Sequence, residues 1–385
     1  MSDQSNYNIH SRVENNINAI NSLLSNHPNL EMLKYYTGWG GLKEAIYTPA
    51  IYKRLKAVLS EGEIKSIKGT LKSSYYTPTL LVDFIYKIVA ALGCKPDSVL
   101  EPSAGHGVFI ERMPTAMRNN AEITAVELDC LSCKLLQTLY PDITVRNQGF
   151  ETFLAPNKYG LIVGNPPFGQ FYVHDQSNPD LSEFSIHHFF VAKSMRLLKD
   201  NGVLAMIVPR YFLDSYRRHV RHIIAKEGGA LVAAYRLPEN LFDDAIVTVD
   251  IVFLQKTKTN INWLNAERIT HGDKQAFINQ YFLERRENIL GEIEFFDIYG
   301  RNEITCKGDG DVFSKLDEKA AAFSARMLKT KNVSGDNSRV LQSLAAINKK
   351  IATIREDCKK LIGVKSEIDQ LSRMLANLQK LTSTI

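Results

Sequence analysis

Apolar positions recur along the chain with two different spacings. Over residues 1–70 they recur at helical spacing, as in VENNINAINSLLSN, and predict helices interrupted by YYTGWGGL at residues 35–42. From about residue 71 to 258, short apolar runs alternate with amphipathic stretches. Such alternation is typical of a mostly parallel sheet with helices on both faces. The strand candidates are SVLE, EITAVE, ITVR, LIVG, GVLAMIVP, LVAAYRL and IVTVDIVFLQK.

This order of elements predicts an α/β fold with a doubly wound sheet of seven strands. The last two strand candidates are joined by a loop rather than a helix, so we expect one of them to run antiparallel at the sheet edge. Beyond residue 258 the pattern weakens, and KTKNVSGDNS has the composition of a linker. The expected parts are a helical region at 1–70, the α/β domain at 71–258, a small accessory region with the linker at 259–338, and a heptad tail at 339–385.

The tail carries a heptad pattern of apolar or small residues. They fall at 340, 344, 347, 351, 354, 358 and 361, and after a step to Val364 they resume at 368, 371, 375 and 378. Steps of three and four in alternation indicate a coiled-coil seam, here with one stammer beside Gly363. We expect residues 340–385 to form a coiled-coil hairpin or to dock a protein partner, with a long helix packed on its own domain as the alternative.

Composition and charge leave several partners open. The 385 residues are 44% hydrophobic and 23% charged, and without a run of 18 apolar residues no membrane partner is expected. The polar start MSDQSNYNIH does not resemble a signal peptide, and five cysteines, an odd number, indicate reduced thiols in the cytoplasm. Cys130 and Cys133 form a CxxC pair without a second ligand pair, so we expect no metal site. The net charge of +5 is compatible with a nucleic-acid partner.

The stretch LIVGNPPFG, residues 161–169, interrupts an apolar run with two prolines. Each proline lacks an N–H and cannot continue a strand ladder, so the strand is expected to stop at Asn165 on a stiff turn. An ordinary strand-to-loop turn is the alternative, because Asn-Pro often begins a turn.

A glycine-containing loop lies upstream in VLEPSAGHGVF, residues 99–109. Gly105 and Gly107 allow a ligand to approach the backbone closely, but Ile110 stands where a dinucleotide fingerprint has its third glycine. The strand before this loop ends at Glu101, whose carboxylate repels phosphate and attracts an ammonium. The loop therefore suits a ligand that carries an ammonium and a sulfonium better than a nucleotide phosphate.

Glu127 follows Gly107 by twenty residues and ends the strand EITAVE. An acidic residue at the tip of the second strand can accept hydrogen bonds from both hydroxyls of a ribose. Together, the loop and Glu127 indicate an adenosine-bearing ligand, with two surface carboxylates at strand ends as the alternative.

In order, these motifs resemble those of the S-adenosylmethionine-dependent amino-methyltransferases, in particular the N6-adenine DNA methyltransferases whose cofactor motif precedes the catalytic one. The matching pieces are YYTP at 75–78, EPSAGHGVF, VELD and NPPF. The resemblance covers residues 71–256 and implies a Rossmann-like methyltransferase fold. YYTGWGGL and FINQYFLERRENILGE resemble segments that flank the methylase part of large phage and plasmid methylase–helicase proteins, although this chain carries no helicase motifs.

The resemblance also implies the cofactor and its contacts. S-adenosylmethionine would be held with Glu127 on the ribose and Phe150 stacked on the cofactor adenine. Where the family often has an aspartate for the adenine amino group, this chain has Gly149, Phe150 and Glu151. The implied cofactor residues are Tyr76, Thr77, Glu101, Ser103, Ala104, Gly105, Gly107, Glu127, Phe150 and Asn165.

The chemistry of an exocyclic amine explains the Asn-Pro-Pro-Phe motif. The lone pair of such an amine is delocalised into the ring, and two acceptors on its N–H bonds free that lone pair. The Asn165 side-chain oxygen and the Pro166 carbonyl are the two acceptors, and Pro167 helps to fix their direction. Phe168 offers a flat face to a flipped base, with a core phenylalanine as the alternative. Methylation of cytosine C5 would need a thiol in this loop, which contains none.

The expected substrate is adenine in DNA, within a restriction-modification system or a phage or plasmid defence or anti-restriction system. Arg210, Arg217, Arg218 and Arg221 form a basic segment for phosphates, with a solvated helix face as the alternative. The polar loop at 169–183 can close over the flipped base. Only about 80 residues separate Lys256 from the tail, so we expect the tail to recruit a subunit that recognises the DNA sequence, a small reader within those residues being the alternative.

Other function classes stay open. Glutamine N5-methyltransferases use the same motif, commonly with tyrosine as its fourth residue, and RNA adenine or guanine amines are a further substrate class. A non-catalytic assembly subunit that acts through its tail is another alternative. The presence of Glu101, Gly105, Gly107, Glu127 and Asn165 argues against it, because a scaffold has no need of all five.

Overall fold

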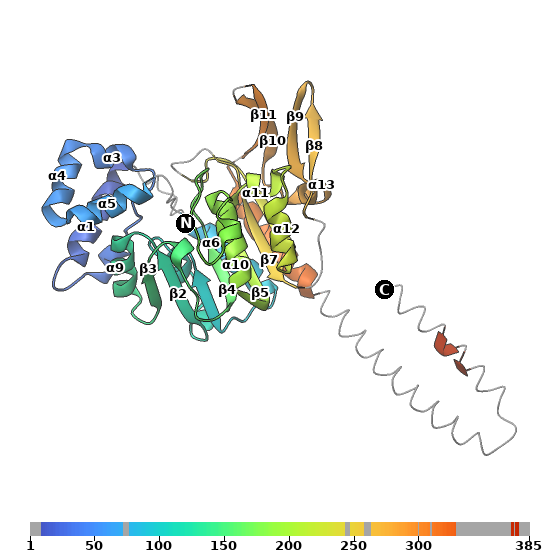
Figure 1. Cartoon of the computed structure of the whole chain (residues 1–385), viewed down its shortest axis with the longest axis horizontal. Coiled ribbons are helices and arrows are strands. Elements are labelled where there is room, and N and C mark those ends of the chain that lie inside the picture. The colour runs from blue at the N-terminus through green and yellow to red at the C-terminus, as the bar shows by residue number, and fades with distance from the viewer. Residues whose placement is uncertain are drawn as a thin grey trace, which may run out of the picture. The chain divides into compact units, whose positions relative to one another are not determined.

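The computed structural model describes residues 9–71, 77–242, 247–257, 263–298, 300–308, 310–328, 371–372 and 374–376. The chain divides into two compact units, Met1–Ala320 and Ala321–Ile385, and the first contains the strands β1 to β11 and the helices α1 to α13 (Figure 1). The linker expected at 329–338 and most of the heptad tail lie outside the described residues. Among the residues described, no helix has the length and apolarity needed to cross a membrane.

A seven-stranded sheet with the order β3-β2-β1-β4-β5-β7-β6 forms the centre of this unit. Strands β1 to β5 pair in parallel, whereas β7 runs antiparallel to both β5 and β6. Seven strands and an antiparallel last strand confirm the prediction. The strands are β1 Ser98–Glu101, β2 Glu122–Glu127, β3 Thr144–Asn147, β4 Tyr159–Gly164, β5 Leu198–Pro209, β6 Gly229–Leu237 and β7 Val249–Lys256.

The expected edge position of the antiparallel strand is wrong. β7 lies between β5 and β6, and β6 forms the edge. The first six positions of β7 are all buried, because Ile251 and Phe253 face one side of the sheet while Val252 and Leu254 face the other. A strand that is apolar on both faces is covered best between two neighbours.

Helices cover both faces of the sheet. Ala234, Val252 and Leu254 point toward α10 and α12 and share one core with them, and both helices lie on the near face in Figure 1. On the opposite face, Phe84 of α6 contacts the rings of Tyr235 and Phe253 at centroid distances of 5.0 and 6.3 Å. The helices of this part are α6 Thr79–Ala91, α7 Val108–Glu111, α8 Thr115–Arg118, α9 Cys130–Leu139, α10 Ile186–Leu197, α11 Tyr211–Asp214 and α12 His219–Lys226.

The N-terminal helices pack on α9. Their core contains Trp39 of the YYTGWGGL segment and also Leu131 and Leu135 of α9. Asn16 fastens this segment to α1, because its amide donates to the Gly38 carbonyl at 2.6 Å and its side-chain oxygen accepts the Thr37 N–H at 2.9 Å. YYTGWGGL thus has a structural role here. The helices are α1 Ile9–Leu23, α2 Leu30–Leu33, α3 Lys43–Tyr47, α4 Pro49–Val58 and α5 Glu61–Thr70.

Two hairpins follow the sheet, and residues 312–328 are helical. The first hairpin pairs β8 Ala266–His271 with β9 Lys274–Asn279, and the second pairs β10 Glu292–Ile298 with β11 Arg301–Lys307. Between them lie α13 Gln280–Glu284 and a 3-10 turn at Arg286–Asn288.

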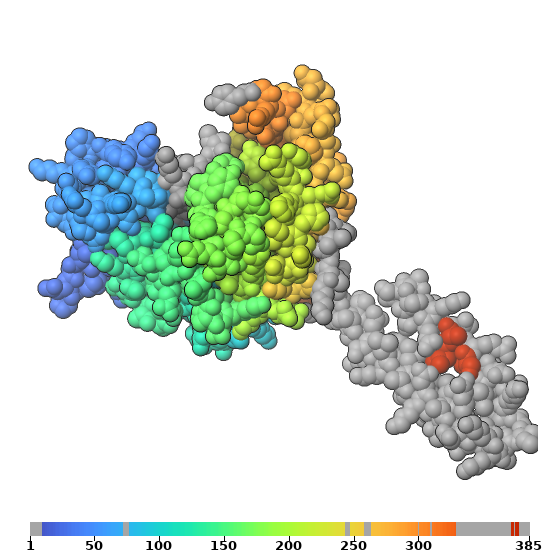
Figure 2. All heavy atoms as spheres, in the orientation of Figure 1, coloured from blue at the N-terminus to red at the C-terminus, as the bar shows by residue number. Residues whose placement is uncertain are grey.

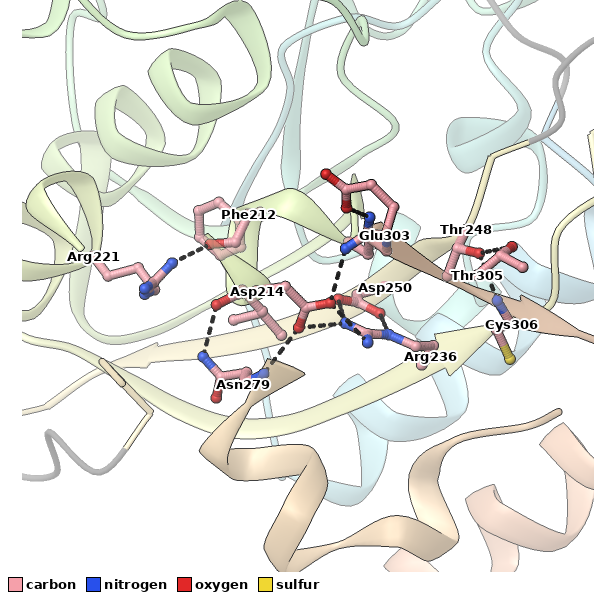
Figure 3. Close-up of polar contacts among 12 residues, drawn as sticks. Phe212, Asp214, Arg221, Arg236, Thr248, Asp250, Asn279, Glu303, Thr305 and Cys306 are labelled. Carbon is pink, nitrogen blue, oxygen red and sulfur yellow. Dashed lines mark hydrogen bonds and ion pairs between the residues drawn. The ribbon is translucent and has the colours of Figure 1, made fainter. Parts of the chain in front are cut away.

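A buried cluster of charges fastens both hairpins to the sheet (Figure 3). Arg236 of β6 pairs with Asp250 of β7 at 2.8 Å and with Asp214 of α11 at 2.9 Å. Asp214 also accepts the backbone N–H of Asn279, the last residue of β9, at 2.9 Å. Arg210 reaches both Asp214 and Glu303 of β11. Burial opposes the charge of Arg236, but Asp214 and Asp250 outweigh it and raise the pKa of the guanidinium.

Candidate active site

The predicted motifs meet at the carboxyl edge of the parallel strands. β1 lies between β2 and β4, so the ends of these strands at Glu101, Glu127 and Gly164 are neighbours. Asn165 follows β4 directly. Ligands of open α/β sheets bind at this edge.

Asn165 is held in one orientation while its acceptor stays open. Its side-chain nitrogen donates to Thr77 Oγ1 at 3.1 Å, and its backbone carbonyl accepts from Ser103 Oγ at 3.1 Å. The side-chain oxygen Oδ1 is buried and accepts no hydrogen bond from any described residue. A buried acceptor without a donor costs stability, and a ligand with an N–H can satisfy it.

The glycine loop is fastened to the tip of β2. Glu127 accepts the backbone N–H groups of Gly105 and Asp129, each at 2.7 Å. Gly107 has a φ of 88°, and a Cβ there would lie 2.5 Å from Leu136 Cδ2. Gly105 has a φ of 54°, but a Cβ there would meet nothing within 4 Å. The loop is therefore tight against α9 at Gly107 and open at Gly105.

The site contains two buried carboxyl groups, those of Glu101 and Glu127, whose pKa values are raised. Glu101 is 2% exposed, and its Oε2 has no hydrogen-bond partner among the described residues. Burial, followed by the charge of Glu127, raises the pKa of Glu101 well above its ordinary value. Burial also raises the pKa of Glu127 to about 7, although the N–H groups of Asp129 and Gly105 oppose this shift. A cation placed beside Glu101 would stabilise its ionised form.

A family model and several curated proteins are similar to part of this chain. A model of the Eco57I restriction-modification methylase family matches residues 108–230. The defense against restriction protein B of Escherichia phage P1 is 28% identical over 194 residues, which cover 49% of this chain and 8% of that protein. The type II methyltransferase M.AccI of Acinetobacter calcoaceticus is 29% identical over 171 residues, which cover 40% of this chain and 32% of that enzyme. The matched residues 108–230 include the Asn-Pro-Pro-Phe motif at 165–168.

The chain spans a small part of the length of these curated relatives. Among solved structures, the methyltransferase subunit of a type I restriction-modification system from Streptococcus thermophilus is similar with a TM-score of 0.44 and 15% identity. That match covers 83% of this chain and 74% of the subunit.

The matches to methyltransferases also support S-adenosylmethionine as the cofactor. The site fits this molecule on structural grounds. Glu101 Oε2 is a buried acceptor that an ammonium can satisfy, and the open space at Gly105 lets a ligand approach the backbone. Glu127 lies at the tip of β2, where a ribose would be held.

The other predicted cofactor residues differ in their burial and in their contacts. Ala104 is buried in the loop beside Ser103, and its N–H donates to the Val126 carbonyl at 3.1 Å. Tyr76 lies outside the described residues. Phe150 is 2% exposed, with Phe190 at a centroid distance of 4.8 Å and Lys193 Nζ 5.0 Å from its ring. Because these neighbours enclose the ring, we correct its role from stacking on the adenine to packing beneath the site.

The predicted catalytic motif is partly buried. Pro166 is buried and Pro167 half-buried, so the chain after Asn165 is confined. Phe168 is half-buried and meets Phe242 edge-on at a centroid distance of 6.5 Å. Part of Phe168 therefore stays accessible beside Asn165.

Two of the four predicted phosphate-binding arginines lie in the interior. Arg221 is 0% exposed and donates to the carbonyls of Leu264, Phe212 and Ser215. Arg210 belongs to the buried charge cluster. Their donors are occupied, so the expectation that these two contact phosphate is wrong. Arg217 and Arg218 are exposed.

A buried ion pair that the sequence analysis missed anchors the loop after the motif. Lys193 Nζ lies 2.8 Å from Asp175, and the two side chains are 2% and 1% exposed. Lys193 also donates to the Phe150 carbonyl at 2.6 Å, which links this loop to the floor of the site. A lysine within the apolar helix IHHFFVAKSMRL is the signal that points to such a pair.

A metal site receives no support. Among the described residues, no group of three or more His, Cys, Asp or Glu side chains is placed to hold a metal ion. Cys133 instead donates to the Glu127 carbonyl at 3.3 Å, and burial raises the pKa of its thiol.

Proposed function

We propose that the protein transfers a methyl group from S-adenosylmethionine to the N6 amino group of adenine in DNA. The observation that carries this proposal is Asn165, whose amide nitrogen is anchored on Thr77 while its buried Oδ1 accepts no hydrogen bond from the residues that the structure describes. The amino group of a base is the donor that this oxygen lacks. The matches to DNA methyltransferases support DNA as the polymer.

Each part of the site has one task in this reaction. S-adenosylmethionine, when bound, supplies a methyl group activated by its sulfonium. Glu101 holds the ammonium of the amino-acid end, and Glu127 accepts the ribose hydroxyls from the tip of β2. The open backbone at Gly105 lines the path between them. These contacts fix the position of the donor without any change of covalent bonds in the protein.

The catalytic loop acts on the nucleophile. Asn165 Oδ1 and the Pro166 carbonyl each accept a hydrogen bond from one N–H of the amine. These two hydrogen bonds direct the lone pair of the amine nitrogen toward the methyl group. The amine nitrogen forms the new bond to carbon as the carbon–sulfur bond breaks, and the amine then loses one proton to water. No protein base is needed, so catalysis rests on positioning and polarisation. The accessible part of Phe168 stacks on the base, which must first leave the duplex.

A role in restriction-modification or in resistance to restriction is the biological setting we propose. It is supported by the match to the Eco57I methylases and by the phage P1 relative, whose name refers to defense against restriction. RNA amines and protein glutamine are the alternative substrates of the same site.

The test is a labelling experiment with three substrates. The protein would be incubated with methyl-labelled S-adenosylmethionine and duplex DNA, ribosomal RNA or a release-factor-like protein, and the modified unit identified after digestion. We expect label in N6-methyladenine, reduced by about 100-fold or more in Asn165→Ala because a preorganised polar group is lost. Asn119→Ala, which removes an exposed amide, is the matched control. Label in RNA or glutamine would reject DNA as the substrate, and a fully active Asn165→Ala would reject the mechanism.

A further inference from the structure

Exposed aromatic rings and arginines gather at the carboxyl edge outside the site described above. We call Tyr172, Tyr216, Arg217, Arg268 and Phe277 the aromatic–arginine cluster. Tyr172 and Tyr216 are 60% and 61% exposed, an unusual state for large aromatic side chains. The five residues come from the loop after the catalytic motif, the turn between α11 and α12, and the β8–β9 hairpin.

Ring contacts connect four members of the cluster. The rings of Tyr216 and Phe277 lie 5.7 Å apart, and the Arg268 guanidinium lies 5.4 Å from the Phe277 ring. Arg217 Nε donates to the Tyr216 hydroxyl at 3.2 Å. This bond raises the pKa of Arg217. Tyr172 lies in the loop that follows the predicted catalytic motif, and its ring is exposed.

Both guanidinium groups of the cluster stay available to an anion. Arg217 and Arg268 are exposed and hydrogen-bond to neutral groups, Arg217 to the Tyr216 hydroxyl and Arg268 to the Gln275 side-chain oxygen at 3.3 Å, so among the described residues neither is paired with a carboxylate. The acidic residues Glu267 and Asp273 of the same hairpin are exposed as well. Arg268 lies opposite Phe277 across the hairpin, on the other face of the strand from Glu267. Arg54 and Arg112, two other exposed arginines, are by contrast ion-paired.

The fold fixes this cluster on the same edge as Asn165. Tyr172 follows the catalytic motif by a few residues, and α11 begins directly after the carboxyl end of β5. Asp214 of α11 holds the end of β9 through the Asn279 N–H, so the hairpin keeps its place beside α11 (Figure 3). Figure 2 shows the yellow-green atoms of α11 and α12 side by side with the gold atoms of the hairpin.

We propose that the aromatic–arginine cluster binds the DNA strand next to the flipped adenine, with its arginines on phosphates and Tyr216 stacked on an unpaired base. The inference rests on the proposed function and names the surface that the substrate uses. Arginine contacts to phosphate release counterions, and exposed aromatic rings stack on bases without regard to sequence. A surface with both features suits a strand that has been opened for base flipping.

The experiment measures DNA binding by fluorescence anisotropy over a series of salt concentrations. Two duplexes serve as probes, one fully paired and one with an abasic site opposite an adenine. We expect Arg217→Ala and Arg268→Ala each to reduce the slope of log affinity against log salt by about one, because each loses one phosphate contact. Tyr216→Ala is expected to bind the abasic duplex about tenfold more weakly, with Tyr216→Phe close to wild type.

Two substitutions on the N-terminal helices provide matched controls. Tyr47→Ala removes a tyrosine that is 55% exposed, and Arg54→Ala removes an exposed arginine. Both are expected to bind DNA as the wild type does. Unchanged slopes and affinities in all cluster variants, with unfolding temperatures equal to wild type, would overturn the inference. A slope change seen with single-stranded RNA alone would also overturn it.

The labelling experiment separates this inference from the proposed function. Altered slopes in the cluster variants support the cluster even if no adenine is labelled. Labelled adenine with unaltered slopes in the cluster variants supports the proposed function and rejects the cluster.

Discussion

At the scale of single residues, Glu101 shows a conflict between function and stability. Oε2 of its buried carboxyl group has no hydrogen-bond partner among the described residues, and the pKa of Glu101 is raised by burial and then by Glu127. A group whose pKa is raised on folding favours the folded state below its unfolded pKa of about 4.3, and that contribution is lost as the pH rises through the folded pKa. The ligand-free protein is therefore less stable at neutral and alkaline pH, because ionisation of the buried Glu101 carboxyl group opposes folding.

Glu101→Gln should stabilise the ligand-free protein in a pH-dependent way. Glutamine resembles the protonated acid, so we expect the melting temperature at pH 8 to rise by about a few degrees, with a smaller gain at pH 5. The same variant should bind S-adenosylmethionine more weakly, since the ammonium loses its partner. Thermal unfolding at both pH values and calorimetric titration measure the two effects. Equal gains at both pH values would contradict the assignment of the raised pKa.

The sequence predicts the positions of some of these residues and not of others. Asn165, Glu101 and Glu127 were predicted because each ends or follows an apolar strand, and the structure brings all three to one edge. Arg221 was misplaced because an arginine in HVRHIIAK has the pattern of a solvated helix face. Its burial depends on carbonyls such as that of Leu264, 43 residues away, and no local pattern records them.

At the scale of elements, the glycine loop joins β1 to α7 under two different constraints. Gly107 has a positive φ and no space for a Cβ, whereas Gly105 has a positive φ in open space. The sequence alone does not distinguish Gly105 from Gly107. Their difference comes from Leu136 on α9, an element that follows them in the chain and packs against only one of them.

Gly107→Ala should therefore be much more harmful than Gly105→Ala. At Gly105 the cost is a left-handed residue, about 1 kcal/mol, while at Gly107 the clash with Leu136 adds about 1–3 kcal/mol. Urea unfolding measures both free energies, and titration measures the loss of cofactor affinity. Gly62→Ala on α5, where a Cβ meets only ordinary contacts, is the control and should be neutral or slightly stabilising. Equal costs at Gly105 and Gly107 would show that Leu136 moves aside.

At the scale of the whole molecule, seven strands and one antiparallel strand were predictable, but the neighbours of β7 were not. Periodicity reports which strands exist and how far they are buried, whereas neighbour order depends on contacts such as Arg236 with Asp250. The hairpins were missed for a similar reason. Their positions are fixed by the buried charges at Asp214 and Arg210 rather than by a long apolar pattern.

The heptad tail remains a prediction from the sequence, since of its residues the structure describes only 371–372 and 374–376. Deleting residues 340–385 should leave cofactor affinity unchanged, because the described cofactor residues lie between Thr77 and Asn165. Site-specific methylation should be lost or relaxed, because we expect the tail to recruit a subunit that recognises the DNA sequence. Calorimetry measures the cofactor affinity, base-resolution sequencing of methylated DNA measures the methylation pattern, and light scattering measures the mass of the assembly.

Point substitutions in the full chain test the same idea without truncation. Ile351→Glu places a charge on the heptad seam, and Lys350→Glu places one beside it. If the seam holds a partner or a second copy, Ile351→Glu should reproduce the deletion while Lys350→Glu stays close to wild type, because burying a charge in a coiled-coil seam is costly. Unchanged mass and an unchanged methylation pattern in both the deletion and Ile351→Glu would assign sequence recognition to the first 339 residues, with the β8–β9 hairpin at the carboxyl edge as its nearest surface.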